Sequence, residues 1–281
     1  MKKRILVFGG TGMLGQVVVK HLVSKGHEVT FTTRKQIPSW MPMRQKVGII
    51  QFEIGQRIPD LSEYDWVINC LGAIKQKTSD PFTLYSANAV FPWQLSFAAK
   101  EAGSKLIHIS SDCVFSGKSL NGYLADAEMD AEDDYGKSKM LGEPLSAIIL
   151  RTSIIGPSPS KTGLFSWFFQ QKEECFGYEN HLWSGVTTLF LAEFIEGLIS
   201  NPPVEIPDSG GLIQIASPPV NKFQLLNIIK DTWGLETKVI PQNFVDSVVN
   251  RVLFPTVALA PEIHEQLVML KNWMIKENVE P

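Results

Sequence analysis

The two side chains best suited to chemistry in this sequence are Tyr135 and Lys139, four residues apart in the run YGKSK. In a helix, that spacing places a phenol and an ammonium on the same face. A phenol with a pKa of about 10 is a poor acid at neutral pH, and a nearby lysine cation lowers that pKa by favouring the phenolate. The spacing therefore predicts a proton donor for carbonyl reduction, although any solvated helix face can carry the same pair by chance.

A glycine-rich run near the start of the chain could hold the reductant for such a reaction. Residues 4–8 are mostly apolar, residues 9–15 read GGTGMLG, and apolar residues at helical spacing follow. A strand, a glycine turn and a helix in this order bind the pyrophosphate of a dinucleotide. We expect Gly9 to permit the tight turn, Gly12 to let the phosphate approach, and Gly15 to let the helix pack on the strand. A glycine-rich connection without a ligand is the alternative.

The composition is that of a soluble, enzyme-sized protein. The chain has 281 residues, of which 44% are hydrophobic and 20% are charged, and its net charge is -3. This charge, without any Lys/Arg-rich run, gives no support for nucleic-acid binding. No apolar run fits a signal segment or the ~20 residues of a membrane span. Cys70, Cys113 and Cys175 are widely spaced, which argues against disulfides and a zinc site and favours a reducing, cytoplasmic location.

Strand-like and helix-like segments alternate through the first half of the chain. Candidate strands are 5–8, 28–32, 48–52, 66–70, 105–110 and 147–150, and candidate helices are 12–25, 80–102 and roughly 134–145. This alternation predicts an α/β fold with a Rossmann-type, doubly wound parallel sheet.

The second half of the chain has a different pattern. Proline-rich loops connect helix candidates at 188–200, 221–233 and 261–276. We expect a nucleotide-binding domain over 1–151 and, over most of 152–281, a smaller substrate-binding lobe, with the chain able to return to the sheet. The lobe should cover the carboxyl edge of the sheet, where open α/β sheets bind ligands.

Residues that follow the second and fourth predicted strands could contact a dinucleotide. An arginine after the second strand accommodates a ribose 2′-phosphate, whereas a carboxylate would favour the free hydroxyl, so Arg34 favours NADP over NAD. The fourth strand ends in Cys70, Leu71 and Gly72, and a glycine there lets the backbone approach a nucleotide. Asn88 lies on the helix expected to flank this edge, where a solvated position and a functional one remain equally open.

The fifth predicted strand delivers hydroxyl groups to the same edge of the sheet. It ends in Ser110 and Ser111, which are followed by Asp112 and Cys113. Ser111 could donate a hydrogen bond to a substrate carbonyl and stabilise negative charge developing on its oxygen, or the serines could only cap a turn. His108 alternates with apolar neighbours in this strand, so we interpret it as a buried core histidine.

Six acidic residues between positions 126 and 134 immediately precede the helix expected to carry Tyr135. They could stabilise the positive end of that helix, but we interpret them as a solvated loop. Their spacing is not that of a calcium-binding loop, and we predict no metal site.

Three motifs together carry a resemblance to a known family. They are GGTGMLG at 9–15, SSDCVFSG at 110–117 and YGKSKMLGE at 135–143. They resemble the extended short-chain dehydrogenases/reductases and, more narrowly, the dTDP-4-dehydrorhamnose reductases. The resemblance covers nearly the whole chain and is most specific through residue 153. It implies an NADPH-dependent reductase, with NADH as a second cofactor, that acts on a nucleotide-linked 4-keto-6-deoxy sugar in deoxysugar and surface polysaccharide biosynthesis.

The resemblance also implies a role for each candidate site residue. Tyr135 would protonate the C4 oxygen as hydride arrives, Lys139 would lower the pKa of that phenol and hold the nicotinamide ribose, and Ser111 would orient the ketone. The remaining cofactor contacts would be Gly9, Thr11, Gly12, Met13, Leu14, Arg34, Cys70, Leu71 and Gly72. The other substrate contacts would be Asp112, Cys113, Trp183 and Arg251.

Two residues depart from the family pattern at the substrate site. Ser111 stands where threonine is usual, and Cys113 stands where tyrosine is usual, so the substrate contacts there could differ. Some relatives bind Mg²⁺ through a carboxylate just after the glycine turn, but Gln16, Val17 and Val18 offer none. The resemblance therefore also gives no reason to expect a metal.

Two other functions are compatible with the same motifs. One is an epimerase or 4,6-dehydratase of the same fold, and the other is a non-catalytic nucleotide-binding subunit similar to the regulatory subunit of methionine adenosyltransferase. Dehydratases usually place an acid at the position of Cys113, and the presence of Ser111, Tyr135 and Lys139 together favours catalysis, so we favour the reductase. The helices at 80–102 and 134–145 could pair across a homodimer or only cover the sheet.

Overall fold

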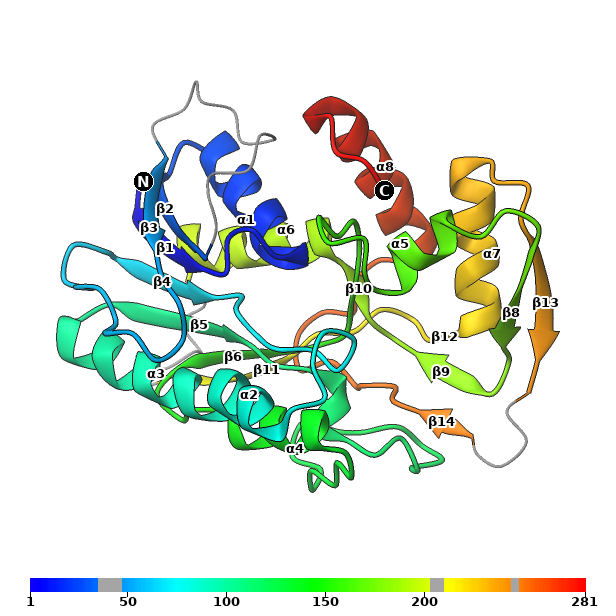
Figure 1. The fold of residues 1–281 in the computed structure, drawn as a ribbon, viewed down its shortest axis with the longest axis horizontal. Coiled ribbons are helices and arrows are strands. Elements are labelled where there is room, and N and C mark those ends of the chain that lie inside the picture. Colours follow the sequence, from blue (N-terminus) through cyan, green and yellow to red (C-terminus); the bar gives the residue numbers. More distant parts are fainter. Residues whose placement is uncertain (35–46, 203–209, 244–247) are drawn as a thin grey trace.

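The centre of the computed structural model is a parallel sheet that contains seven strands among the described residues, which are 1–34, 47–202, 210–243 and 248–281 (Figure 1). Its strand order is β11-β6-β5-β4-β1-β2-β3. The strands are β1 Arg4–Phe8, β2 Glu28–Thr33, β3 Gly48–Gln51, β4 Trp66–Asn69, β5 Lys105–Ile109, β6 Ile148–Arg151 and β11 Gly211–Gln214. The order reverses between β1 and β4, and ligands bind at such switch points. The predicted Rossmann-type fold is confirmed.

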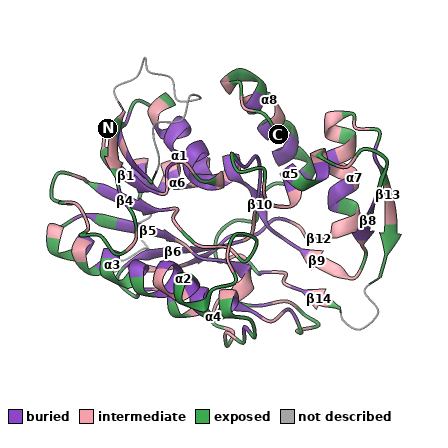
Figure 2. Cartoon of the chain, in the orientation of Figure 1, coloured by how far each residue is buried: buried purple, intermediate pink, exposed green. Residues whose placement is uncertain are grey.

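The sheet is buried on both faces, as the apolar strands require (Figure 2). In β1, Ile5 and Val7 pack into one core, and Leu6 and Phe8 pack into the other. The first face is covered by α1 (Met13–Ser24) and α6 (Thr188–Ser200), and the second by α3 (Phe91–Ala102). Near-continuous apolar strands are typical of parallel sheets covered by helices on both sides.

The predicted helix at 80–102 is interrupted by a π-helical turn. It consists of α2 (Pro81–Tyr85), the π-helical turn Ser86–Val90 and α3. Pro92 has no N–H to donate to the carbonyl of Asn88 four residues earlier, so the regular hydrogen-bond ladder cannot continue there. Such turns are frequent at functional sites, and this one positions Asn88 as a buried residue.

The helix that carries Tyr135 is shorter than predicted and begins with a defined cap. It is α4 (Asp134–Leu141), which ends at Gly142. The Asp133 carboxylate caps its first turn by accepting a hydrogen bond from the Gly136 N–H at 2.6 Å. The interpretation of the acidic run as only a solvated loop was therefore wrong for Asp133, because the unpaired N–H groups at a helix start favour a carboxylate.

The chain returns to the sheet in its second half. The helices predicted at 188–200, 221–233 and 261–276 are present as α6, α7 (Lys222–Trp233) and α8 (Ile263–Glu277). However, α6 shares a core with α1, and β11 pairs with β6, so both belong to the sheet and its covering layer. The apolar residues of α6 find their partners there rather than in the lobe. The domain division at 151/152 stays a prediction.

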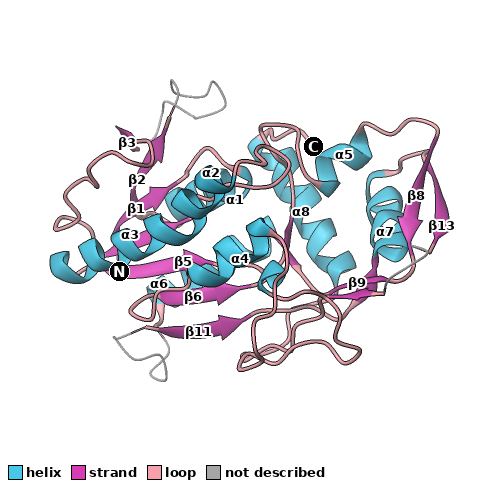
Figure 3. Cartoon of the chain, turned by 60° about the horizontal axis from the view of Figure 1, so that its bottom comes forward, coloured by secondary structure: helices cyan, strands magenta, loops and turns pink. Residues whose placement is uncertain are grey.

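The rest of the second half forms a lobe beyond the carboxyl ends of the central strands (Figure 3). Strands β8 and β13 pair in parallel, and β9 lies between β12 and β14. The remaining elements are β7 Ile154–Ile155, α5 Leu164–Phe169, β8 Glu174–Tyr178, β9 His181–Trp183, β10 Val186–Thr187, β12 Val220–Asn221, β13 Lys238–Gln242 and β14 Val249–Asn250. Within the described ranges, no helix is long and apolar enough to cross a bilayer.

Candidate active site

The glycine turn between β1 and α1 leaves backbone donors available to a ligand. Gly9 has a φ of 77°, and a Cβ there would lie 2.9 Å from the backbone of Leu71. A Cβ on Gly15 would lie 2.1 Å from the Gly9 carbonyl oxygen, which confirms that Gly15 lets the helix pack on the strand. Gly12 is the N-cap of α1 and has no side chain to bond the first-turn N–H groups. Such a helix start fits a pyrophosphate.

Strand β2 runs beside this turn. The Gly9 N–H donates to Thr32 Oγ1 at 3.0 Å, and the exposed Arg34 follows directly after the strand. Thr11 and Met13 are partly exposed at the turn, whereas Leu14 is buried, so Leu14 could reach a cofactor only through its backbone. The predicted cofactor residues therefore lie along the switch point, with Arg34 at its β2 side.

The loop after β4 forms the other side of this switch point, and Asn88 holds it in place. The Asn88 side chain accepts from the Ala73 N–H at 2.9 Å and donates to the Ala73 carbonyl at 2.9 Å and to Ser138 Oγ at 3.0 Å. The same loop contains Cys70, whose thiol pKa burial raises to about 12, and Gly72, which lies against Asn88. Asn88 thus joins the loop after β4 to α4. It is buried and not solvated, and its functional role stays a prediction.

The loop after β5 and helix α4 bring Ser111, Tyr135 and Lys139 to the same edge of the sheet. Ser111 Oγ accepts from the Cys113 N–H at 3.1 Å and donates to Asp112 Oδ1 at 3.1 Å. Its side chain also acts on the Tyr135 phenol, whose pKa it lowers. Lys139 Nζ donates to the carbonyl of Ile109, the last residue of β5, at 2.7 Å. Lys139 is thereby anchored to the end of β5, two residues before Ser111 in the chain.

The pKa of Tyr135 is shifted in the direction opposite to the expected one. Burial raises the Tyr135 pKa, and the nearby Cys113, Asp112 and Asp133 raise it further, while the hydrogen bond with Ser111 opposes the shift. The lowering expected from Lys139 does not prevail, because desolvation penalises the phenolate and the Lys139 ammonium is directed at a carbonyl. A phenol that stays protonated at neutral pH is in the correct form to donate a proton.

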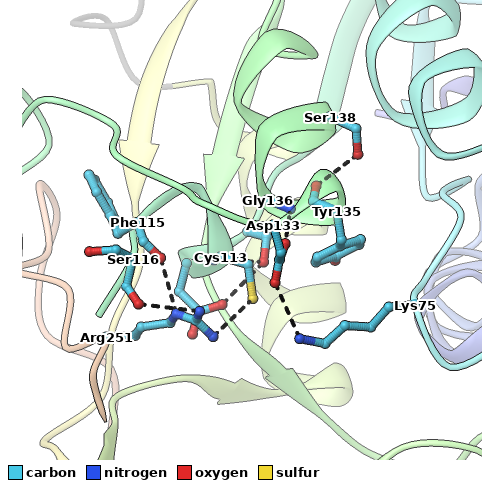
Figure 4. Close-up of polar contacts among 11 residues, drawn as sticks. Lys75, Cys113, Phe115, Ser116, Asp133, Tyr135, Gly136, Ser138 and Arg251 are labelled. Carbon is cyan, nitrogen blue, oxygen red and sulfur yellow. Dashed lines mark hydrogen bonds and ion pairs between the residues drawn. The ribbon is translucent and has the colours of Figure 1, made fainter. Parts of the chain in front are cut away.

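Arg251 comes from the far end of the sequence to the loop after β5. Its guanidinium donates to the Phe115 carbonyl at 3.1 Å, to the Ser116 carbonyl at 3.4 Å and to Cys113 Sγ at 3.6 Å (Figure 4). Burial, with the neighbouring Asp112, raises the Cys113 thiol pKa to about 12, so the thiol remains protonated at neutral pH. The structure therefore places Arg251 next to Cys113, and the role of both residues in binding a substrate stays a prediction.

Comparison with known proteins shows the family of this chain. The sequence model of the RmlD substrate binding domain matches residues 2–161, which is more than half of the chain. The chain belongs to this family. The RmlD-type reductases are the branch of the extended short-chain dehydrogenases/reductases that the three motifs resemble, so the predicted resemblance is confirmed.

Individual relatives agree with this assignment. The RmlD-family chain is 27% identical to the spore coat polysaccharide biosynthesis protein SpsK of Bacillus subtilis over 84% of its own length and 82% of that protein. It is 30% identical to a dTDP-4-dehydrorhamnose reductase of Mycolicibacterium smegmatis over 51% of its own length and 41% of that protein. The structure of a dTDP-4-dehydrorhamnose reductase from Bacillus anthracis in complex with NADP superposes with a TM-score of 0.75 at 18% identity, covering 98% of this chain and 100% of that one. At that identity, the superposition supports the shared fold.

Sequence reasoning about this RmlD-family protein missed a buried carboxylate behind the site. Glu143 receives two hydrogen bonds from the Arg151 guanidinium, at 3.1 and 2.7 Å, and a third from the Ser110 hydroxyl. Burial lowers the Lys139 pKa to about 8, and the Glu143 charge opposes that lowering. Glu143 therefore ties the end of α4 to strands β5 and β6 and helps keep Lys139 charged. Its position four residues after Lys139 was the available signal.

The lobe of the RmlD-family protein presents a lysine that was also missed. Trp183, a predicted substrate contact, is only 4% exposed, and its indole N–H donates to Ser153 Oγ at 2.8 Å. The Lys222 ammonium lies 4.8 Å from the centroid of a Trp183 ring. No signal in the sequence indicates this pair, because nothing in residue spacing brings position 222 next to position 183.

Proposed function

We propose that this protein is an NADPH-dependent reductase that converts a nucleotide-linked 4-keto-6-deoxy sugar to the alcohol in deoxysugar or surface polysaccharide biosynthesis. The observation that carries this proposal is the convergence of Ser111, Tyr135 and Lys139 beside an uncapped glycine turn at the switch point of the sheet. Relatives named as a spore coat polysaccharide biosynthesis protein and as a dTDP-4-dehydrorhamnose reductase support the same substrate class.

The residues at the glycine turn fit a dinucleotide cofactor. Gly12 leaves the first-turn N–H groups of α1 without a side-chain cap, and a Cβ on Gly9 would collide with the loop after β4. The pyrophosphate would be held by Gly9, Thr11, Gly12, Met13 and Leu14, with Cys70, Leu71 and Gly72 along the opposite wall. Arg34 would face the adenosine ribose, where its charge favours the 2′-phosphate of NADPH over NADH. The bound cofactor would supply hydride.

The protein's own residues would then supply orientation and a proton. Ser111 would turn its hydroxyl from Asp112 to the ketone oxygen, and Tyr135 would donate its phenolic proton to that oxygen. The raised pKa of Tyr135 keeps the proton available before reaction. The positive charge of Lys139, one turn along α4 from Tyr135, would stabilise the phenolate left after transfer.

The substrate side of the site favours reduction over dehydration. A dehydratase mechanism places a carboxyl group at the position of Cys113. Cys113 supplies a thiol instead, which lies beside Arg251 and stays protonated. Asp112, Cys113, Trp183 and Arg251 would line the sugar-nucleotide site. We propose no metal as part of this chemistry.

We further propose that the protein acts as a homodimer. Large apolar side chains are exposed on α2, α3 and the segment around the end of α4, namely Phe82, Trp93, Phe97, Leu141 and Leu145. Trp93 donates a hydrogen bond to the Leu141 carbonyl, so these two residues lie side by side, and adjoining exposed apolar side chains are typical of a protein interface. Light scattering coupled to size exclusion should give twice the monomer mass, and Phe97→Lys should return it to one. A monomeric wild-type protein would contradict this arrangement.

The free thiols bear on where the protein works. Cys70 and Cys113 are partly exposed free cysteines, and Cys175 is a buried one. Such thiols persist in a reducing compartment, so we propose that the protein acts in the cytoplasm.

The function can be tested by following NADPH absorbance, and then NADH absorbance, with the purified protein. The substrates are dTDP-, UDP- and GDP-linked 4-keto-6-deoxy sugars. Oxidation with one of them would establish the reductase and its substrate together. If cofactor binds but none of the ketosugars oxidises it, the reductase assignment fails, and tightly bound, recycled nicotinamide would indicate an epimerase.

A further inference from the structure

Lys222 is a cation held against an aromatic ring at the edge of the active site. It is the first residue of α7, and its ammonium lies 4.8 Å from the centroid of a Trp183 ring. The Trp183 ring is fixed by its hydrogen bond to Ser153 and by contact with Gly185, where a Cβ would lie 2.3 Å from the indole. Within the described residues, the Lys222 ammonium has no hydrogen-bond acceptor or carboxylate in contact.

The position of Lys222 is unfavourable for a lysine that only stabilises the fold. The start of a helix carries partial positive charge, so a cation in the first turn of α7 is disfavoured. Asn221 already caps this turn by accepting from the Gln224 N–H. An ammonium has three donors, and the face of a ring accepts none of them as a full hydrogen bond. A ligand that supplies anionic oxygens would compensate the charge and satisfy the donors.

Strand β9 lies between β12 and β14, so Lys222, which follows β12, and Arg251, which follows β14, flank Trp183 at the end of β9. The charged and titratable groups around it are Asp112 and Cys113 on the loop after β5, Arg251 after β14, and His181 on β9. Burial lowers the Lys222 pKa to about 8, Asp112 and Cys113 oppose this shift, and Arg251 adds to it. Burial also lowers the His181 pKa, and Lys222 and Arg251 lower it further.

The charges of this group do not cancel. Arg251 binds two carbonyl oxygens and the Cys113 sulfur, which are neutral acceptors. Among the described residues, Asp112 is the carboxylate whose charge acts on Lys222, and it already accepts a hydrogen bond from Ser111. Arg251 also interacts with Asp133, which is already paired with Lys75 at 3.4 Å. The three cations Lys75, Lys222 and Arg251 thus face the two carboxylates Asp112 and Asp133, which leaves net positive charge for an anionic ligand.

We propose that Lys222 is a substrate-binding residue whose ammonium, together with the Arg251 guanidinium, binds the diphosphate of the nucleotide sugar. This inference rests on the proposed function and names the side chains with which the lobe binds the diphosphate of that substrate. In it, the contribution of Trp183 to the lining of the sugar-nucleotide site is to support Lys222 with its ring. A diphosphate carries more than one negative charge and several acceptor oxygens, which matches two cations better than a single hydroxyl group does.

The test compares three variants of α7. Lys222→Met keeps the apolar stem on Trp183 and removes the charge, Lys222→Arg keeps the charge, and Lys230→Met removes a lysine from the last turn of the same helix as a matched control. Isothermal titration of NADPH-saturated protein with UDP and dTDP measures diphosphate binding, and uridine and thymidine measure nucleoside binding without phosphate. KM and kcat are measured with the nucleotide sugar that is turned over.

Lys222→Met should weaken UDP and dTDP binding and raise KM by about tenfold or more, with NADPH affinity unchanged and kcat within about threefold. Lys222→Arg and Lys230→Met should stay within about threefold of wild type. Wild-type affinity for UDP should fall as pH rises through about 8, where free Lys222 loses its proton. Lys139 titrates in the same range, so loss of this pH dependence in Lys222→Arg, which retains Lys139, would assign it to Lys222.

Two outcomes separate this proposal from the proposed function. If a nucleotide ketosugar oxidises NADPH while Lys222→Met leaves KM and UDP affinity unchanged, or if Lys222→Arg is as defective as Lys222→Met, the role of Lys222 is overturned and the reductase stands. If no ketosugar oxidises NADPH but UDP binding still depends on the charge at position 222, the reductase is overturned and the diphosphate site stands.

Discussion

Gly136 lies where helix α4 packs against the loop after β5, so it sets the distance between Tyr135 and Ser111. It follows Tyr135 in the first turn of α4, and a Cβ there would lie 2.4 Å from the Cys113 carbonyl oxygen and 2.7 Å from the Ala131 Cβ. Cys113 belongs to the short 3₁₀ helix Asp112–Val114, which Ser111 caps. The absence of a side chain at position 136 therefore lets Tyr135 approach Ser111.

The substitution Gly136→Ala should separate these two residues. Ordinary contact begins at 3.4 Å, so the 2.4 Å approach to the carbonyl oxygen would have to open by about 1 Å. A misplacement of about 1 Å can cost about 100-fold in turnover, and overpacking costs about 1–3 kcal/mol of unfolding free energy. We expect kcat to fall by about 100-fold, with NADPH affinity nearly unchanged because the glycine turn is not touched.

The assay pairs turnover, measured from NADPH absorbance, with urea unfolding and NADPH titration. Gly197→Ala is the control, because a Cβ at that position in α6 meets nothing within 4 Å. It should leave turnover unchanged and stabilise the fold by up to about 1 kcal/mol. A Gly136→Ala protein that is folded and turns over within about threefold of wild type would refute the argument that this contact sets the catalytic distance.

Three further changes test the remaining residues of the site. Tyr135→Phe should lower turnover by about 100-fold or more with NADPH affinity intact, because it removes the proton donor, and undiminished turnover would remove Tyr135 from the mechanism. Glu143→Gln removes the charge that opposes the lowering of the Lys139 pKa, so the alkaline loss of activity should begin at lower pH than in wild type. The same change should destabilise the fold by about 3 kcal/mol, because the buried Arg151 charge loses its carboxylate partner. A pH profile identical to wild type would contradict this role. Arg34→Glu should reverse the cofactor preference from NADPH to NADH, measured as the ratio of the two kcat/KM values. An unchanged ratio would show that Arg34 does not bind the 2′-phosphate.

The sequence by itself determined the fold and indicated the candidate reactive groups. The alternation of apolar runs and helical periods predicted a doubly wound parallel sheet, because each pattern repeats with the geometry of its own element. The carboxyl ends of parallel strands meet at one edge, so residue order alone was enough to place Gly9 and Ser111 at the same edge. His108 was also interpreted correctly as a core residue, since it has no exposed area and hydrogen-bonds with Asn69.

Only the tertiary structure decided how these groups are tuned and supported. The Tyr135 pKa rises rather than falls, because desolvation depends on every chain segment that packs around the phenol. The contact between Glu143 and Arg151 and the contact between Lys222 and Trp183 join segments whose meeting no local spacing encodes. Sequence periodicity fixes which residues share a strand end or a helix face, whereas burial and long-range pairing exist only once the whole chain has packed.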